Sequence, residues 1–143
     1  MKIIQFYFLN RKPVLKERKR LRLFIENLFF QENKRLGNLS YIFCSDKHLL
    51  GMNNDFLKHD FYTDVITFDL SSNKSETKGE VYISIDRIKE NSKLVGVSFN
   101  EELHRVIFHG ALHLCGYNDK KRTETLKMRA REERYLKMYF HLI

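Results

Sequence analysis

Residues 109–119, HGALHLCGYND, constrain the fold of this chain more than any other segment. His109 and His113 are four residues apart, which in a helix is about 400° of rotation and about 6 Å of rise, so both rings project from one face. Gly116 predicts the end of that helix, because glycine enters the left-handed conformation without strain. The chain can then turn back and bring Asp119 toward the two histidines.

Two imidazoles and one carboxylate at this spacing predict a metal site. The pattern H-x-x-x-H-x-x-G-x-x-D has the ligand spacing of the zinc-protease motif H-E-x-x-H-x-x-G-x-x-H, with Asp in place of the last His. Three protein ligands leave a fourth position for water, as a catalytic zinc ion requires. We therefore expect His109, His113 and Asp119 to bind one Zn²⁺ per chain, or another divalent metal.

The residue after the first histidine separates two hydrolytic chemistries. Zinc proteases have a glutamate there that activates water, whereas this chain has Gly110. We expect the glycine to remove the general base of a peptidase and to open space beside the ion for a tetrahedral phosphate. Zinc lowers the pKa of water from about 15.7 to near 7, so hydrolysis does not depend on that glutamate. A zinc peptidase is therefore a disfavoured alternative.

Hydrophobic periodicity in the rest of the chain predicts an α+β fold. Strands and helices alternate in the first half of the sequence, whereas the second half is helical. We expect one small mixed sheet backed by helices, a metal-binding helix like that of the zincins, and a single domain over residues 1–143. The expected strands are 2–8, 39–44, 64–70 and 80–85, the expected helices are 14–31, 46–56, 86–94, 98–116 and 123–140, and residues 71–79 are expected to form a mobile loop.

Composition bears on the partner and the compartment. The chain has 26 Lys and Arg against 18 Asp and Glu, and the net charge of +8 favours a polyanion such as nucleic acid. The two cysteines, Cys44 and Cys115, are too few for a disulfide framework, which is consistent with a reducing cytosol. We expect both to be small apolar side chains buried in the protein. No segment approaches the ~20 apolar residues of a membrane span, and no secretory cleavage site follows the first strand. We expect a cytoplasmic protein without membrane contact.

Other charged residues near the histidines are expected to have ordinary roles. His104 is about 140° round the helix from His109 and should face elsewhere. Glu101 and Glu102 are interpreted as charges that stabilise the first helical turn. The last expected helix alternates basic and acidic residues, which predicts ion pairs on its surface among Lys127, Arg129, Arg131, Arg134, Glu124, Glu132 and Glu133.

The chain resembles the YbeY family of bacterial endoribonucleases. The family signature H-G-x-L-H-L-x-G-Y-D-H is met here as H-G-A-L-H-L-C-G-Y-N-D, and TDVITF at 63–68 and GEVYIS at 79–84 resemble two family strands. Met128 and Glu132 fit the M-x-x-x-E pattern of the family's closing helix. The resemblance implies a zinc enzyme that cleaves single-stranded RNA in ribosomal RNA maturation and ribosome quality control, with the ribosome or ribosome-associated proteins as partners.

Two departures from the family pattern bear on the chemistry. Asp119 replaces the last histidine of the signature, which lowers the net charge of the site by one and makes the ion a weaker Lewis acid. Leu57 stands where the family has an arginine that acts on the substrate, and neighbouring Lys58 or His59 is expected to replace it. Three basic residues directly after the last ligand are expected to hold RNA at the mouth of the site: Lys120, Lys121 and Arg122.

A binding protein is the main alternative to an enzyme. The weaker ligand charge and the missing arginine favour an RNA-associated or ribosome-associated factor whose metal is mainly structural. Two histidines and one carboxylate also suit iron(II) oxygen chemistry, but nothing in the sequence indicates a co-substrate for it.

Overall fold

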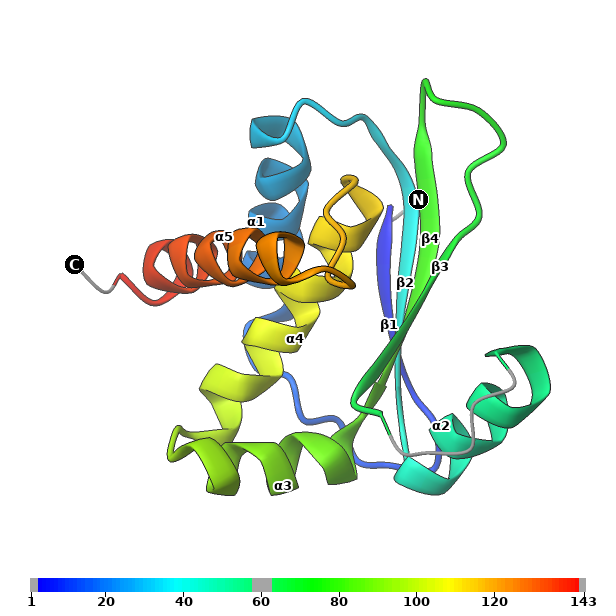
Figure 1. Cartoon of the computed structure of the whole chain (residues 1–143), viewed down its shortest axis with the longest axis vertical. Coiled ribbons are helices and arrows are strands. Elements are labelled where there is room, and N and C mark those ends of the chain that lie inside the picture. The colour runs from blue at the N-terminus through cyan, green and yellow to red at the C-terminus, as the bar shows by residue number, and fades with distance from the viewer. Residues whose placement is uncertain (1–2, 58–62, 142–143) are drawn as a thin grey trace.

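A four-stranded mixed sheet forms the centre of the computed structural model, which describes residues 3–57 and 63–141 (Figure 1). The strands lie in the order β1-β2-β4-β3. The first three of these are parallel, and β3 runs antiparallel to β4 at one edge. The strands are β1 (Ile4–Phe8), β2 (Leu36–Cys44), β3 (Val65–Asp69) and β4 (Thr77–Ser84).

Helices cover the sheet mainly on one side. Helices α1, α4 and α5 lie on that side, whereas α2 lies near one end of the opposite side (Figure 1). The predicted α+β class with one mixed sheet backed by helices is therefore confirmed. The helices are α1 (Arg18–Gln31), α2 (Asp46–Met52), α3 (Ile85–Val95), α4 (Phe99–Leu114) and α5 (Arg122–Phe140), and a π-helical turn, η1 (Asn53–Leu57), follows α2.

The main core lies between the sheet and helices α1, α4 and α5. Tyr41 and Phe43 from β2 and Val81 and Ile83 from β4 are fully buried in it. Burying a large apolar side chain of this kind stabilises a fold by roughly 1.5–3 kcal/mol. The Tyr41 hydroxyl also donates a 2.8 Å hydrogen bond to the carbonyl of Ile107, which joins the middle of the sheet to α4.

Gly110 determines how closely α4 approaches β4. A Cβ atom built on Gly110 would lie 2.7 Å from Cγ1 of Val81, so only a glycine allows this separation of helix and strand. The expectation that Gly110 opens space beside a metal ion is therefore wrong, because the residue faces the sheet and not the two histidines. Because residue 110 is a glycine, the helix still lacks the glutamate that acts as the general base in zinc proteases.

Both cysteines are buried and free of disulfides, as predicted. Burial raises the pKa of the Cys44 thiol to about 11 and that of the Cys115 thiol to about 12. At neutral pH neither residue presents the thiolate that a metal ligand or a nucleophile requires.

Two helix boundaries differ by more than two residues from the sequence-based predictions. Helix α1 begins at Arg18 and not at Val14, because Glu17 adopts a left-handed conformation with φ of 53° that no helix can include. The predicted helix 46–56 changes its hydrogen-bonding pattern after Met52 and continues as η1.

Two strands are longer than predicted. Leu36 of β2 pairs with Thr77 of β4, so both strands begin three residues before the expected positions 39 and 80. The connection between β3 and β4 is correspondingly shorter and covers residues 70–76. No helix within residues 3–57 and 63–141 is both long enough and apolar enough to cross a lipid bilayer.

Candidate metal centre

Helix α4 carries the two histidines and ends as the sequence predicts. The Ser98 side chain accepts a 3.0 Å hydrogen bond from the backbone N–H of Glu101 and so caps the beginning of the helix. At the other end, Gly116 has φ of 107°, and the backbone N–H of Tyr117 donates to the carbonyl of Leu112. This left-handed glycine terminates the helix and reverses the chain toward its last turn.

The reversal brings Asp119 to both histidines. Nε2 of His109 and Nε2 of His113 each lie 3.4 Å from Oδ2 of Asp119. One ligand atom from each residue lies within 4.8 Å of the other two. Ligand atoms about 2.0–2.1 Å from a tetrahedral zinc ion are separated by about 3.4 Å, so the two histidine–aspartate distances fit a common ion.

A buried carboxylate holds His109 in position. Glu132 of α5 is only 3% exposed, and its Oε2 accepts a 2.7 Å hydrogen bond from Nδ1 of His109. This bond keeps the proton on Nδ1 and leaves Nε2 free toward Asp119, as in the carboxylate–histidine–metal arrangement of many metalloproteins. Glu132 is therefore buried and not exposed as predicted, although its Oε1 does form an i,i+3 ion pair with Arg129, at 3.8 Å.

Arg105 in turn holds Glu132. The Arg105 side chain is 13% exposed, and one of its terminal nitrogens lies 3.3 Å from Oε1 of Glu132. The same guanidinium contacts Glu133 and lies 3.7 Å from Glu102. A buried carboxylate needs such a partner, because an unpaired charge in this position would be strongly destabilising.

Glu102 is an acidic residue of the first helical turn, as predicted, but its side chain is also buried. It lies in the first turn of α4, but it is 7% exposed and lines the cleft beside the histidines. Burial raises the pKa of this carboxyl, and the charge of Arg105 opposes the rise. Glu102 therefore belongs to the charge network behind the site, whereas Glu101 is a half-buried residue of the first turn, as predicted.

The surrounding carboxylates favour positive charge between the histidines. Burial lowers the pKa of His109, but its hydrogen bond to Glu132 and the charges of Glu132 and Asp119 raise it above the ordinary value. Burial and the neighbouring His109 lower the pKa of His113, and Asp119 opposes them. A divalent cation supplies the positive charge that this arrangement favours without protonating either ring.

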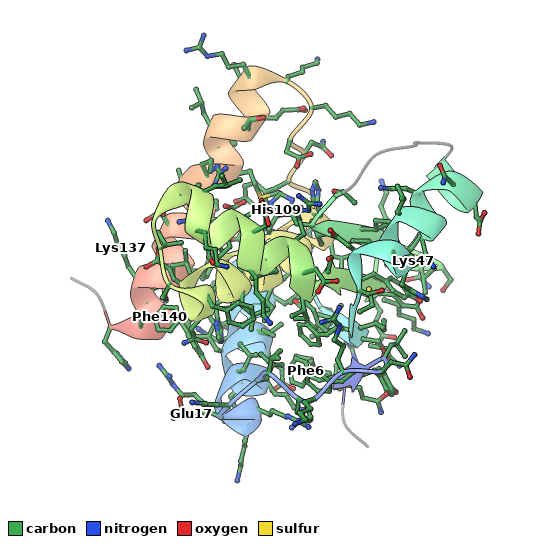
Figure 2. The ribbon with its side chains drawn as sticks, turned by 90° about the horizontal axis from the view of Figure 1, so that it is seen from below. Phe6, Glu17, Lys47, His109, Lys137 and Phe140 are labelled. Carbon is green, nitrogen blue, oxygen red and sulfur yellow. The ribbon has the colours of Figure 1, made fainter. Side chains whose placement is uncertain are left out.

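The three donor groups open into a cleft of about 670 Å³. One wall is formed by residues 63–69 at the edge of the sheet, and the other walls come from α4 and the first half of α5. In Figure 2, His109 lies near the middle of the molecule, whereas Lys47 and Lys137 lie at its periphery. The cleft therefore gives a large ligand access to the half-buried rings of His109 and His113 and to the exposed carboxylate of Asp119.

The other predicted site residues have different surroundings. Lys120 lines the cleft, and Lys121 and Arg122 are exposed directly beyond it where α5 begins. The predicted substitutes for the family arginine, Lys58 and His59, lie outside the described residues. His104 faces away from the site, as predicted, and stacks on Tyr139 with a ring-centroid distance of 5.0 Å.

A pattern in the sequence indicates the burial of Glu132. Met128, Glu132, Tyr135 and Tyr139 recur at helical spacing, and all four are buried in the structure. A glutamate on the apolar stripe of a helix is rarely buried without a partner. The alternating charges of α5 do not by themselves distinguish its buried face from its exposed face.

Comparison with known proteins identifies relatives over most of the chain. A family model described as Endoribonuclease YbeY matches residues 11–140. A protein of that description from Cytophaga hutchinsonii is 47% identical over 124 residues, which is 87% of each chain. Another from Flavobacterium psychrophilum is 46% identical over 115 residues, which is 80% of this chain and 81% of the relative.

The fold is also similar to a solved structure. The solution structure of TM1509 from Thermotoga maritima superimposes with a TM-score of 0.62 and 26% sequence identity. The match covers 96% of this chain and 89% of TM1509, so it includes the sheet and the helices that form the cleft.

Proposed function

Because the chain belongs to the YbeY family of endoribonucleases, we propose that it is a metal-dependent endoribonuclease that cleaves single-stranded RNA in ribosomal RNA maturation. The observation that carries the proposal is the convergence of His109, His113 and Asp119 on one point of a large cleft. The match of the family model to residues 11–140 supports a single catalytic domain.

We further propose that the resident metal is one Zn²⁺ per chain. His109 and His113 would bind it through Nε2 and Asp119 through one carboxylate oxygen, and these donor types are all common at zinc sites. When bound, such an ion supplies a Lewis acid that makes water more acidic and polarises a phosphate oxygen. Glu132 keeps the His109 ring oriented, and Arg105 forms an ion pair with Glu132.

The surroundings of the centre suit a polyanion. Lys120, Lys121 and Arg122 follow the last ligand and present exposed positive charge at the edge of the cleft, where they are proposed to bind the phosphate backbone. Lys58 and His59 remain the sequence-based candidates for a catalytic cation. We propose a cytoplasmic protein that meets the ribosome or its associated proteins, and ribosome quality control remains part of this proposal.

A peptidase is less well supported. Position 110 has no glutamate, and Gly110 is pressed against Val81 so that no longer side chain fits without movement of the helix or strand. The edge strand β3 beside the cleft is the feature that a peptidase would use to hold an extended peptide. Casein hydrolysis that a chelator blocks would favour this alternative.

The second candidate function is a ribosome-associated or RNA-associated factor with a mainly structural metal. The buried network of Arg105, Glu132 and His109 favours it, because such a network also stabilises the packing of α4 on α5. Chelation then separates the two candidates. Loss of RNA binding together with thermal stability indicates a structural metal, whereas loss of cleavage alone indicates a catalytic one.

The direct test compares the purified wild type with His113→Ala on a labelled single-stranded RNA. We expect metal-dependent cleavage by the wild type, no cleavage and no bound metal in His113→Ala, and unchanged cleavage in His48→Ala, since His48 is exposed and does not line this cleft. The corresponding double-stranded RNA should remain intact. Equal cleavage by the wild type and a metal-free His113→Ala protein would refute the proposal.

A further inference from the structure

Helix α5 lies along the metal centre and contacts it at two points. Near its beginning, the Thr125 hydroxyl donates a 2.9 Å hydrogen bond to the backbone carbonyl of Asp119. Further along, Glu132 accepts the hydrogen bond from His109. One face of α5 is thereby held against both the ligand loop and the ligand helix.

Arg129 lies between these two contacts. It follows Thr125 by four residues and precedes Glu132 by three, which places all three within about 60° on one face of the helix. Arg129 also lines the same cleft as His109, His113 and Asp119. Arg129 therefore lies about one helical turn from each of the two residues through which α5 contacts the ligand loop and the ligand helix.

The Arg129 guanidinium is accessible to a ligand. Its side chain is 64% exposed, and its nearest carboxylate oxygen among the described ion pairs is Oε1 of Glu132 at 3.8 Å. That distance is too long for a hydrogen bond, so the N–H donors of Arg129 are not used by Glu132. Its positive charge also acts on two carboxyls of the cleft, Asp64 and Glu102, whose pKa values it lowers against the larger effect of burial.

The other described cations of the cleft are less suited to bind a phosphate at the metal centre. Three cationic residues line the described part of the cleft: Arg105, Lys120 and Arg129. Arg105 is 13% exposed and is already engaged by Glu102, Glu132 and Glu133. Lys120 offers a point charge, whereas a guanidinium presents paired N–H donors that match two phosphate oxygens.

We propose that Arg129 binds the scissile phosphate of RNA at the metal centre through its two non-bridging oxygens. This inference rests on the proposed endoribonuclease function and adds a substrate contact from α5. Arg129 stays protonated throughout and exchanges no proton with the substrate. Its contribution is electrostatic: it attracts the bound phosphate and favours the additional negative charge that develops on the phosphate oxygens when water attacks phosphorus.

The test uses three variants of the full chain. Arg129→Ala removes the guanidinium, Arg129→Lys keeps the charge without the paired donors, and Lys127→Ala removes one exposed charge of α5 that does not line the cleft. Cleavage of a single-stranded RNA oligonucleotide with added Zn²⁺ gives kcat and KM. Elemental analysis gives the metal content, and fluorescence anisotropy in chelator gives the RNA affinity as a function of salt.

We expect Arg129→Ala to lower kcat/KM by about 100-fold and Arg129→Lys by about 10-fold, with metal content equal to that of the wild type. In chelator, the slope of log affinity against log salt should fall by about 0.7 in Arg129→Ala, as for loss of one phosphate contact with a single strand. Lys127→Ala should retain kcat/KM to within about 3-fold, because a distant exposed charge contributes only long-range attraction.

Cleavage by Arg129→Ala at the rate of Lys127→Ala would overturn the inference while leaving the endoribonuclease function intact. If the wild type itself does not cleave RNA, the proposed function fails, and the anisotropy measurement then decides about Arg129. Equal RNA affinity and equal salt dependence of the wild type and Arg129→Ala would refute the phosphate contact.

Discussion

At the scale of single residues, two carboxylates with different exposure have different roles at the centre. Asp119 is 38% exposed and faces both histidine rings, so it is available as a ligand. Glu132 is 3% exposed and contacts His109 on the opposite ring nitrogen, so it orients the ring. The type of residue alone does not distinguish these roles, because both are acidic residues near the same histidine.

Replacement of Glu132 tests this orienting role. Glu132→Gln keeps the shape but removes the charge, and we expect a loss of metal affinity of about 10- to 100-fold, as for other partners of a metal-bound histidine. Competition titration with a zinc-binding dye measures the affinity. Glu133→Gln is the matched control, since Glu133 contacts Arg105 but not His109. Equal loss of metal affinity in both variants would show that the charge network around Arg105 determines the metal affinity, and that the orientation of the His109 ring by Glu132 does not.

The lowered pKa of His104 predicts how the free energy of unfolding depends on pH. Burial lowers the pKa of His104, opposed by a 2.7 Å hydrogen bond from its Nδ1 to the carbonyl of Asn100. The unfolded chain then binds a proton at higher pH than the native protein, so the free energy of unfolding falls as the pH drops below about 6.5.

The variant His104→Phe keeps an aromatic ring but cannot titrate. Urea denaturation in the presence of chelator at pH 7.5 and 5.5 measures the free energy of unfolding of both proteins. We expect the wild type to lose more stability than His104→Phe on acidification. The same loss in both proteins would show that His104 does not contribute to the pH dependence.

At the scale of elements, the position of α4 against β4 determines where the histidines lie. Gly110 is one residue beyond His109 and contacts Val81, so any shift of the helix from the strand also moves His109. The packing of α4 on the sheet and the contacts of α5 on α4 together place the three donor groups. The candidate metal centre is in this sense a product of helix packing and not only of the local motif.

Gly110→Ala tests the close approach of α4 to β4. The new Cβ would meet Val81 at 2.7 Å, and we expect a loss of about 1–3 kcal/mol in the free energy of unfolding together with weaker metal binding. Gly51→Ala is the control, because it lies in α2 with no atom within 4 Å of the new Cβ and should stabilise the protein by about 0.5–1 kcal/mol. Differential scanning calorimetry measures the thermal stability of both variants. An unchanged melting temperature for Gly110→Ala would contradict the packing argument.

The sequence predicts the elements better than their ends. Periodicity identifies α4 and its glycine terminus because both depend on local backbone preferences. The pairing of Leu36 with Thr77 was not predictable from pattern alone, since strand pairing joins residues distant in the sequence. The orientation of Gly110 was misjudged for the same reason: spacing places a residue on a helix face but does not show which element covers that face.

At the scale of the whole molecule, the candidate site was predictable to the extent that it lies in one segment. Residues His109, His113 and Asp119 belong to 11 consecutive positions, and local helix geometry brings them together. Glu132 and Arg129 come from α5, and only the tertiary packing of α5 on α4 brings them to the centre. The expectation of a single domain over 1–143 remains a prediction.

The net charge of +8 predicts that the affinity for RNA falls as the salt concentration rises. Replacing Lys120, Lys121 and Arg122 together by alanine should weaken RNA binding and lower the slope of log affinity against log salt by about 2, at about 0.7 per lost phosphate contact. Anisotropy measured in chelator at several salt concentrations gives this slope. A slope equal to that of the wild type would show that these three residues do not contact the phosphate backbone.

The central claim is that three side chains of one segment bind a single divalent ion. Equilibrium dialysis against Zn²⁺ followed by elemental analysis measures the number of tightly bound ions per chain directly. We predict one ion per chain for the wild type and for His48→Ala, and none for His113→Ala. A wild type that takes up no zinc, manganese, iron or other divalent metal, or a His113→Ala protein that binds the ion as tightly as the wild type, would contradict the account.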